Sequence, residues 1–152
     1  MKRRELQTSV WIPQPVDEVF AFFSDAFNLD RITPPWLHFA VLTESPIPMK
    51  PGQLIDYRLR WRWIPMKWRT EIVAWEPPRF FIDQQIHGPY RLWHHEHTFV
   101  QENGGTRMMD KVTYAVPGWI FEPFLNKFLV RPDVERIFLY REDRIQQIFS
   151  DR

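Results

Sequence analysis

The stretch QLIDYRLRWRW, residues 53–63, contains the most regular pattern in this chain. Apolar and charged side chains alternate along it, with Ile55, Tyr57, Leu59 and Trp61 on one side and Asp56, Arg58, Arg60 and Arg62 on the other. Because successive side chains of a strand point to opposite faces of a sheet, the alternation predicts a strand with one buried face. A sheet of such strands has an apolar face that another element must cover.

Other stretches on both sides of this one have the same β-forming character. We predict strands over residues 5–13, 37–45, 53–63, 66–76, 79–87, 91–101 and 106–116. The segments between the later strands contain Ile64-Pro65, Pro77-Pro78, Gly88-Pro89 and Asn103-Gly104-Gly105. Proline and glycine pairs of this kind are typical of turns. Consecutive strands joined by short turns predict an antiparallel sheet of seven strands.

Two parts of the chain show helical spacing instead. Apolar residues recur three and four positions apart over residues 16–23, which predicts a short helix, and a second short helix is expected over 26–31. From residue 119 onward a longer helix is expected, with Phe121, Phe124, Leu125, Phe128, Val134, Ile137, Phe138, Arg141, Ile145, Ile148 and Phe149 at helical spacing. Pro132 is expected to kink or split this helix.

The order of elements predicts the fold class. One strand, two short helices, six strands and a long C-terminal helix make an α+β chain, and we expect a single domain over residues 1–152. Packing the long helix on a curved antiparallel sheet buries the apolar face of each. Where a curved sheet and a helix part, an apolar cavity is expected, and such a cavity is a typical ligand site.

Composition excludes several classes of function. The net charge is +1, whereas nucleic-acid-binding domains are strongly basic, so no nucleic-acid partner is expected. Cysteine is absent, which excludes disulfides and thiolate chemistry. No signal peptide is expected, because no apolar run follows the basic N-terminal residues, and no membrane span is expected, because no run approaches about 18 apolar residues. A soluble cytoplasmic protein is therefore predicted, and aromatic residues, at 16%, are numerous enough for a dense core or an aromatic-lined cavity.

Several local motifs resemble a known superfamily along most of the chain. They are Ile32-Thr33-Pro34-Pro35-Trp36-Leu37, Thr70-Glu71-Ile72, Trp75-Glu76-Pro77-Pro78, Phe81-Ile82-Asp83-Gln84-Gln85, Gly88-Pro89-Tyr90, Trp93-His94-His95-Glu96-His97-Thr98-Phe99, Gly104-Gly105-Thr106, Asp110, Val112 and Tyr114. Together with the element order, they resemble the START-like, or SRPBCC, superfamily. Its members include polyketide cyclases and aromatases, plant pollen-allergen proteins and lipid-transfer domains.

The resemblance implies a helix-grip fold and a pocket rather than one reaction. The subgroup that it suggests is the bacterial ligand-binding SRPBCC or cyclase/dehydrase-like group, which brings no single activity with it. From strand parity and the family motifs, the expected ligand-binding residues are Tyr57, Leu59, Trp61, Trp68, Thr70, Phe81, Asp83, Gln85, Trp93, His95, His97, Asp110, Val112, Tyr114, Phe124 and Phe128.

Five of these residues are polar and are expected to form a cluster inside the aromatic cage. They are Asp83, Gln85, His95, His97 and Asp110. Buried polar groups cost about 1–3 kcal/mol each unless they are hydrogen-bonded, so the cluster must bond to itself, to water or to a ligand. It is therefore a structural network, a ligand-orienting group, or a catalytic acid–base pair of His95 or His97 with Asp83 or Asp110.

A metal site is the least favoured interpretation of this cluster. His95 and His97 share one strand face, but His94 and Glu96 point the other way, so the run of polar residues divides between two faces. No metal and no cofactor are expected. The arginines of residues 58–69 are expected to form a solvated outer face, and the tryptophans of this region fall on the opposite side.

The C-terminal phenylalanines are the last feature with two interpretations. Phe121, Phe124, Phe128 and Phe138 are expected to pack in the core, some of them at the edge of the cavity. The alternative is that Trp119, Ile120 and Phe121, which follow Pro117-Gly118, form a lid at the entrance.

Three functions remain open from the sequence. The first is a carrier of a hydrophobic small molecule, such as a lipid, an aromatic or a polyketide-like compound. The second is a cyclase, aromatase or dehydratase acting in the same cavity, and the third is a structural domain with a filled core. The sequence favours the carrier and leaves the oligomeric state open.

Overall fold

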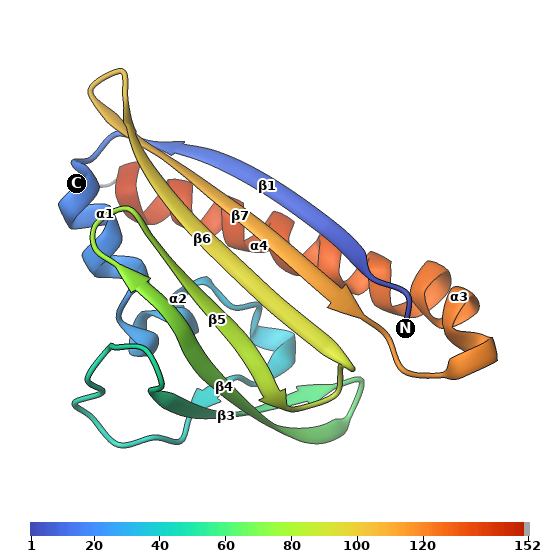
Figure 1. Ribbon diagram of the computed structural model, residues 1–152. Helices are drawn as coiled ribbons and strands as arrows, with labels where there is room; N and C mark the ends of the chain where they lie inside the picture. Colours follow the sequence, from blue (N-terminus) through green and yellow to red (C-terminus); the bar gives the residue numbers. More distant parts are fainter. Residues whose placement is uncertain (151–152) are drawn as a thin grey trace.

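The computed structural model describes residues 1–150 of the chain, and it contains one antiparallel sheet of seven strands (Figure 1). The strands are β1 (Arg4–Ile12), β2 (Ala40–Val41), β3 (Leu54–Trp61), β4 (Ile64–Glu76), β5 (Phe80–His87), β6 (Leu92–Glu102) and β7 (Gly105–Ala115). Their order in the sheet is β1-β7-β6-β5-β4-β3-β2. Strands β2 to β7 therefore pair in sequence order, and β1 closes the far edge against β7.

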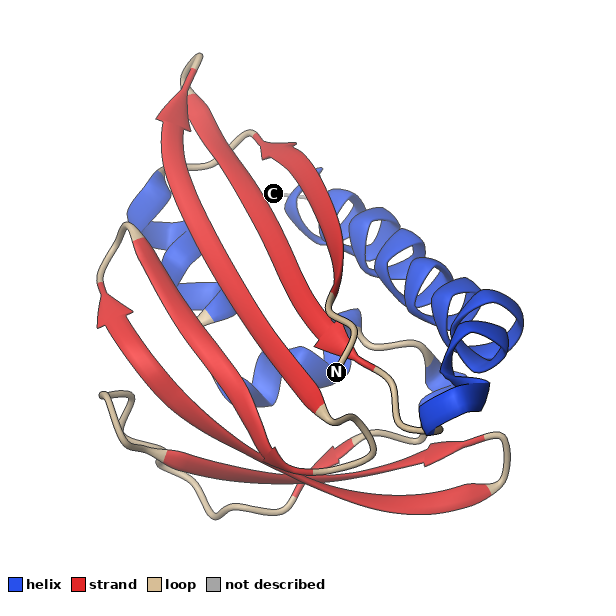
Figure 2. Ribbon diagram, turned by 45° about the vertical axis from the view of Figure 1, so that its right-hand side comes forward, coloured by secondary structure: helices blue, strands red, loops and turns tan. Residues whose placement is uncertain are grey.

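Helical elements follow the first strand and the last. They are α1 (Val16–Phe23), the 3₁₀ turns η1 (Ala26–Asn28) and η2 (Pro35–Leu37), α2 (Leu29–Ile32), η3 (Trp119–Phe121), α3 (Glu122–Leu125), the π-helical turn η4 (Asn126–Val130) and α4 (Arg131–Ser150). The sheet curves around the long helix α4, as Figure 2 shows. The predicted helix-grip fold, with two short helices after the first strand, is confirmed. Among the described residues no helix is long and apolar enough to cross a membrane.

The core at one end of this arrangement is aromatic. Phe20 of α1 lies with its ring centroid 5.2 Å from that of Phe99 of β6, and Phe23 lies 6.3 Å from Phe149 of α4. These residues belong to one cluster of buried side chains that joins α1, the sheet and the end of α4. At this end α1 fills the space between the sheet and the long helix, and a second buried cluster joins β7 to α4 directly.

Two local expectations on the strands are wrong. The chain turns between β3 and β4 at Arg62 and Trp63, not at Ile64-Pro65, which lie inside β4. Both turn residues have positive φ, 48° and 75°, and a two-residue turn of this kind matches the twist of a hairpin. The predicted strand over 37–45 is reduced to Ala40–Val41, because His38, with φ of 48°, still belongs to the end of η2.

Pro132 does disturb the C-terminal helix, and the disturbance takes the form of a widened turn. Residues 126–130 form a π-helical turn between α3 and α4, and the N–H of Arg131 donates to the carbonyl of Asn126. A proline has no N–H to give to the preceding turn, and the π-helical turn lies in the residues directly before Arg131 and Pro132. This turn decides which side chains of the segment face the sheet.

Candidate functional site

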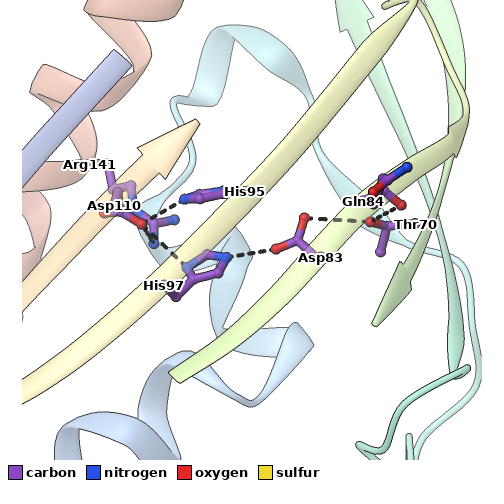
Figure 3. Close-up of polar contacts among 7 residues, drawn as sticks. All are labelled: Thr70, Asp83, Gln84, His95, His97, Asp110 and Arg141. Atoms are coloured by element: carbon purple, nitrogen blue, oxygen red, sulfur yellow. Dashed lines mark hydrogen bonds and ion pairs between the residues drawn. The ribbon is translucent and has the colours of Figure 1, made fainter. Parts of the chain in front are cut away.

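Four charged or titratable side chains from three neighbouring strands meet on the concave face of the sheet. Asp83 of β5 lies opposite His95 of β6, and His97 of β6 lies opposite Asp110 of β7. The hydrogen bonds run diagonally across these pairs: His97 Nε2 donates to Asp83 Oδ2 at 2.6 Å, and His95 Nε2 donates to Asp110 Oδ1 at 2.6 Å (Figure 3). The pleat of the antiparallel sheet therefore interlocks the two pairs.

The two pairs form one continuous network. His97 Nδ1 lies 3.3 Å from Asp110 Oδ1, so His97 stands between both carboxylates. The rings of His95 and His97 stack with centroids 3.7 Å apart. At the other end Thr70 Oγ1 lies 3.5 Å from Asp83 Oδ1 and 3.1 Å from the carbonyl oxygen of Gln84. The network spans β4 to β7.

The long helix adds a fifth charged group, Arg141. Its side chain points from α4 toward the sheet, and Nη2 lies 3.5 Å from Asp110 Oδ1 (Figure 3). The residue is only 8% exposed, yet its Nε and Nη2 have no hydrogen-bond partner within the described residues 1–150. A buried guanidinium has five donors to satisfy, so Arg141 holds unused donors beside the network.

Burial and neighbouring charges set the protonation of the histidines in opposite directions. Burial alone would lower the pKa of His97, but its contacts with the carboxylates of Asp110 and Asp83 raise it above its usual value. Burial and the charge of His97 together lower the pKa of His95, against the hydrogen bond to Asp110. The network thus favours the imidazolium form of His97 and the neutral form of His95, whose Nδ1 is left as an acceptor.

Both carboxyl groups stay ionised in this environment. Burial would raise the pKa of Asp110, but the charge of Arg141 and the hydrogen bonds from His95 and His97 hold it well below its usual range. Burial likewise opposes ionisation of Asp83, and the hydrogen bond and charge of His97 nevertheless lower its pKa. Two carboxylates therefore balance two cations, Arg141 and His97, in the interior of the protein.

A cavity of about 400 Å³ lies between the sheet and α4, next to this network. Its lining is mostly apolar, and His95 and Arg141 contribute polar groups to its wall. Trp68, Tyr90 and Trp93 form an aromatic wall, with ring centroids 4.8 to 5.6 Å apart. Asp133 also lines the cavity, where its Oδ2 accepts a hydrogen bond of 2.7 Å from Trp61 Nε1.

The expected ligand-binding residues fall into four places. Those at the cavity are Leu59, Trp61, Trp68, Trp93 and His95. Those behind it, in the polar network, are Thr70, Asp83, His97 and Asp110. Those in the packed core are Tyr57, Phe81, Val112 and Tyr114. The remaining three, Gln85, Phe124 and Phe128, lie elsewhere and differ from the expectation.

Gln85 lies apart from the polar network. Its Nε2 donates to the carbonyl of Tyr90 at 2.7 Å, and its Oε1 accepts from the N–H of Tyr90 at 3.2 Å. It shares a strand face with Asp83, but it lies beyond the last paired residue of β5 against β6, Gln84. Gln85 therefore fixes the loop that places Tyr90 in the cavity wall.

Phe124 and Phe128 lie on the outer surface, 66% and 62% exposed, and not in the core or at the cavity. Phe121 is 63% exposed, whereas Phe138 is buried as expected. The helical turns that carry the three exposed rings direct Leu125 and Leu129 toward the cavity instead. Helical spacing alone does not tell which of two apolar faces turns inward.

The sequence analysis did not predict that Arg141 and several residues from other elements line the cavity. The signal for Arg141 was available, because a single charge stands in the apolar stripe of α4 between Phe138 and Ile145. The other lining residues not expected include Ile32, Leu37, Met66, Tyr90, Leu125, Leu129, Val130 and Asp133. No local pattern marks these residues, because their meeting depends on how the sheet curves.

The network also has the spacing of a metal site. Ligand atoms of Asp83, His95 and His97 lie within 4.8 Å of one another. Asp83 and Asp110 already bind the imidazole groups, and Arg141 places a positive charge 3.5 Å from Asp110. A second cation at this place would meet that charge, so the donor set fits its own hydrogen bonds better than a divalent ion.

A seven-stranded sheet closed on a long helix, with a cavity between them, defines a helix-grip protein. The chain belongs to the family described as polyketide cyclase/dehydrase and lipid transport, which matches residues 12–136. The resemblance to the SRPBCC superfamily is thereby confirmed. No curated protein matches the chain in a search by sequence.

Solved structures share the fold at low sequence identity. Zhui aromatase/cyclase from Streptomyces sp. R1128 superposes with a TM-score of 0.75 at 15% identity, over 98% of this chain and 94% of that one. Protein Ms6760 from Mycobacterium smegmatis gives 0.72 at 19% identity, over 97% and 91% of the two chains. Major latex-like protein 151 from Panax ginseng gives 0.70 at 12% identity, over 97% of each. At these identities the likeness is one of fold.

Proposed function

We propose that this protein binds a hydrophobic small molecule, of lipid, aromatic or polyketide-like type, with a hydrogen-bond acceptor at one end. The observation that carries the proposal is the mostly apolar cavity of about 400 Å³ whose lining includes Arg141, a buried residue whose Nε and Nη2 have no hydrogen-bond partner within residues 1–150. An apolar cavity with a few convergent polar groups is the usual form of a small-molecule site. The family description, with its mention of lipid transport, supports the same function.

Arg141 determines which polar group the proposed ligand carries. An apolar ligand fills the part of the cavity lined by Trp68, Tyr90 and Trp93. A carboxylate, phenolate or carbonyl oxygen at its end accepts hydrogen bonds from Arg141, which has donors to spare after its contact with Asp110. His95, also in the lining, can accept a hydrogen bond from a ligand hydroxyl at Nδ1. A purely aliphatic ligand would leave these groups unsatisfied.

The experiment measures the binding of two fluorescent probes that differ in charge. Anilinonaphthalene sulfonate carries an anionic group, and N-phenyl-1-naphthylamine does not. Filling the cavity with Leu59→Trp is expected to weaken binding of both probes about tenfold. Leu139→Trp, at an exposed position of α4, is the control and leaves both unchanged. Equal binding by Leu59→Trp and wild type would contradict the proposal.

Arg141→Met separates the polar end of the site from its apolar part. It is expected to weaken the sulfonate about tenfold and to leave the uncharged probe nearly unchanged. Arg136→Met, at an exposed position of the same helix, is the matched control. Native mass spectrometry of protein purified from its own host then identifies the retained molecule.

An enzyme of the cyclase, aromatase or dehydratase type is the second candidate. The observation that favours it is the neutral His95 at the cavity wall, hydrogen-bonded to the ionised Asp110. Such a pair can act as a general base, taking a proton at Nδ1 while Asp110 stabilises the charge that forms. Turnover of a polyketide-like substrate that His95→Ala abolishes, with probe binding retained, would establish this function over that of a carrier.

A further inference from the structure

Five large apolar side chains of one short segment face outward. They are Trp119, Ile120, Phe121, Phe124 and Phe128, and between 62% and 82% of each is exposed. We call this set the aromatic patch. Single exposed apolar residues are common on proteins, but a contiguous group of large ones marks an interaction surface.

The segment is held in place, so the exposure of the patch is a feature of the fold. Its buried side carries Glu122, which accepts hydrogen bonds of 2.8 and 3.1 Å from Arg4. Asn126 is also buried and lies 3.0 Å from the hydroxyl of Tyr114. The chain enters the segment through Gly118, with φ of 120°, and Trp119, with φ of 51°. A tryptophan in this left-handed region costs energy, which the anchors on the inner side offset.

The patch lies at the cavity. Leu125, Leu129 and Val130 of the same segment line the cavity from inside, so one short stretch separates the cavity from the exposed rings. Figure 1 shows this stretch projecting beyond the sheet at the end opposite α1. Across from it, the tip of the β3–β4 hairpin exposes Trp63, and the bond between Trp61 and Asp133 joins that hairpin to α4.

The charges around the patch favour an anionic partner. Glu122 is paired with Arg4, and Asp133 is paired with Arg62 at 3.4 Å. Lys127 lies beside the ring of Phe128, 5.4 Å from its centroid, and no acidic side chain of residues 1–150 forms an ion pair with it. The acidic groups near the patch are thus neutralised, and a positive charge remains among the rings.

We propose that the aromatic patch docks on an anionic lipid bilayer and presents the cavity to it. Tryptophan and phenylalanine next to lysine are the side chains that insert at the boundary between headgroups and acyl chains. A projecting helical turn suits a deformable lipid surface. Docking is independent of the proposed function, and only the passage of a ligand between bilayer and cavity rests on it.

The test is sedimentation with vesicles of phosphatidylcholine and phosphatidylglycerol, compared with phosphatidylcholine alone. Wild type is expected to bind the anionic vesicles, and the Trp119→Ser/Phe124→Ser variant is expected to bind at least about tenfold more weakly. Leu139→Ser, at a position of α4 as exposed as Phe124, is the control and retains wild-type binding. Lys127→Glu is expected to weaken binding to the anionic vesicles more than binding to vesicles of phosphatidylcholine alone.

Other outcomes overturn the proposal in distinguishable ways. Absence of wild-type binding to either vesicle refutes bilayer docking. A wild-type dimer that the double variant converts to a monomer, with no vesicle binding, assigns the patch to a second copy of the chain. If wild type binds the vesicles but does not bind the fluorescent probes, the proposed function is refuted and the docking proposal is not.

Discussion

The two ends of the helix-grip use the same kind of residue in opposite ways. At one end, phenylalanines of α1, β6 and α4 pack on one another, with Phe22 5.1 Å from Phe149 and Phe23 5.9 Å from Phe99. At the other end, Phe124 and Phe128 face outward, and a cavity lies behind them. The difference comes from coverage, because α1 fills the space between sheet and helix at the first end only.

This difference separates stability from binding. The packed end buries phenylalanine rings from α1, the sheet and α4, and their burial contributes hydrophobic free energy of folding. The open end keeps a cavity and an exposed patch, both of which leave apolar surface unpacked. Substitutions at the two ends should therefore affect different measurements.

The largest expected effect is the loss of a packed ring. Phe99→Ala, at a residue 3% exposed between α1 and the sheet, is expected to lower the free energy of unfolding by about 3–5 kcal/mol. Phe124→Ala, the matched change at the open end, is expected to alter it by less than about 0.5 kcal/mol. Urea unfolding measures both. Similar losses at the two positions would remove the distinction between the two ends.

The next effect concerns the polar network between the ends. His97→Gln removes the cation between Asp83 and Asp110, and the cost expected for breaking a buried charge pair is about 3 kcal/mol. Adding Asp83→Asn removes one of the stranded charges, so the double variant should lose less than the single one. A double variant less stable than His97→Gln would show that the carboxylate of Asp83 is satisfied without the histidine.

A smaller effect is the pH dependence that the network confers. The raised pKa of His97 adds stability that is complete below the ordinary value of 6.5 and is lost as the pH rises through the folded pKa. The lowered pKa values of Asp83 and Asp110 add stability present above 3.8 and lost as the pH falls through the folded values. The stability difference between wild type and His97→Gln should therefore be largest between these limits.

His95, which lies beside His97, contributes its own pH dependence, so wild type and His97→Gln must be compared. His95 has a lowered pKa, so its own contribution is lost as the pH falls below 6.5, opposite in direction to that of His97. Thermal unfolding of both proteins from pH 4 to 9 gives the difference curve. A difference that does not shrink above the folded pKa of His97 would contradict an imidazolium at this position.

Much of the sheet could be predicted from local pattern, and the turns could be predicted less well. The alternation from Ile55 to Trp61 places these side chains on the concave face, and Leu59 and Trp61 reach the cavity. The turn at Arg62 and Trp63 was not predicted, because nothing in the two side chains favours positive φ and Pro65 offered a stronger local signal.

The site shows the same division between local and long-range information. The alternation of side chains along the strands predicted that His95, His97, Asp83 and Asp110 share one face of the sheet. It did not predict which of them reach the cavity. His95 does, while the others lie behind it, because the depth of each residue depends on the curvature of the sheet and the position of α4. Arg141 joins the network across the core, a contact that local pattern does not encode.

The sequence by itself determined the antiparallel sheet and the long C-terminal helix, because periodicity and turn residues act over a few positions. Its motifs, together with the order of elements, carried the resemblance to the superfamily. Strand alternation already turned Phe99 inward, but only the tertiary structure decided that Phe124, at regular helical spacing, is exposed. A side chain is buried when another element covers it. The placement of α1 at one end, and the widened turn before Pro132 at the other, decide that coverage.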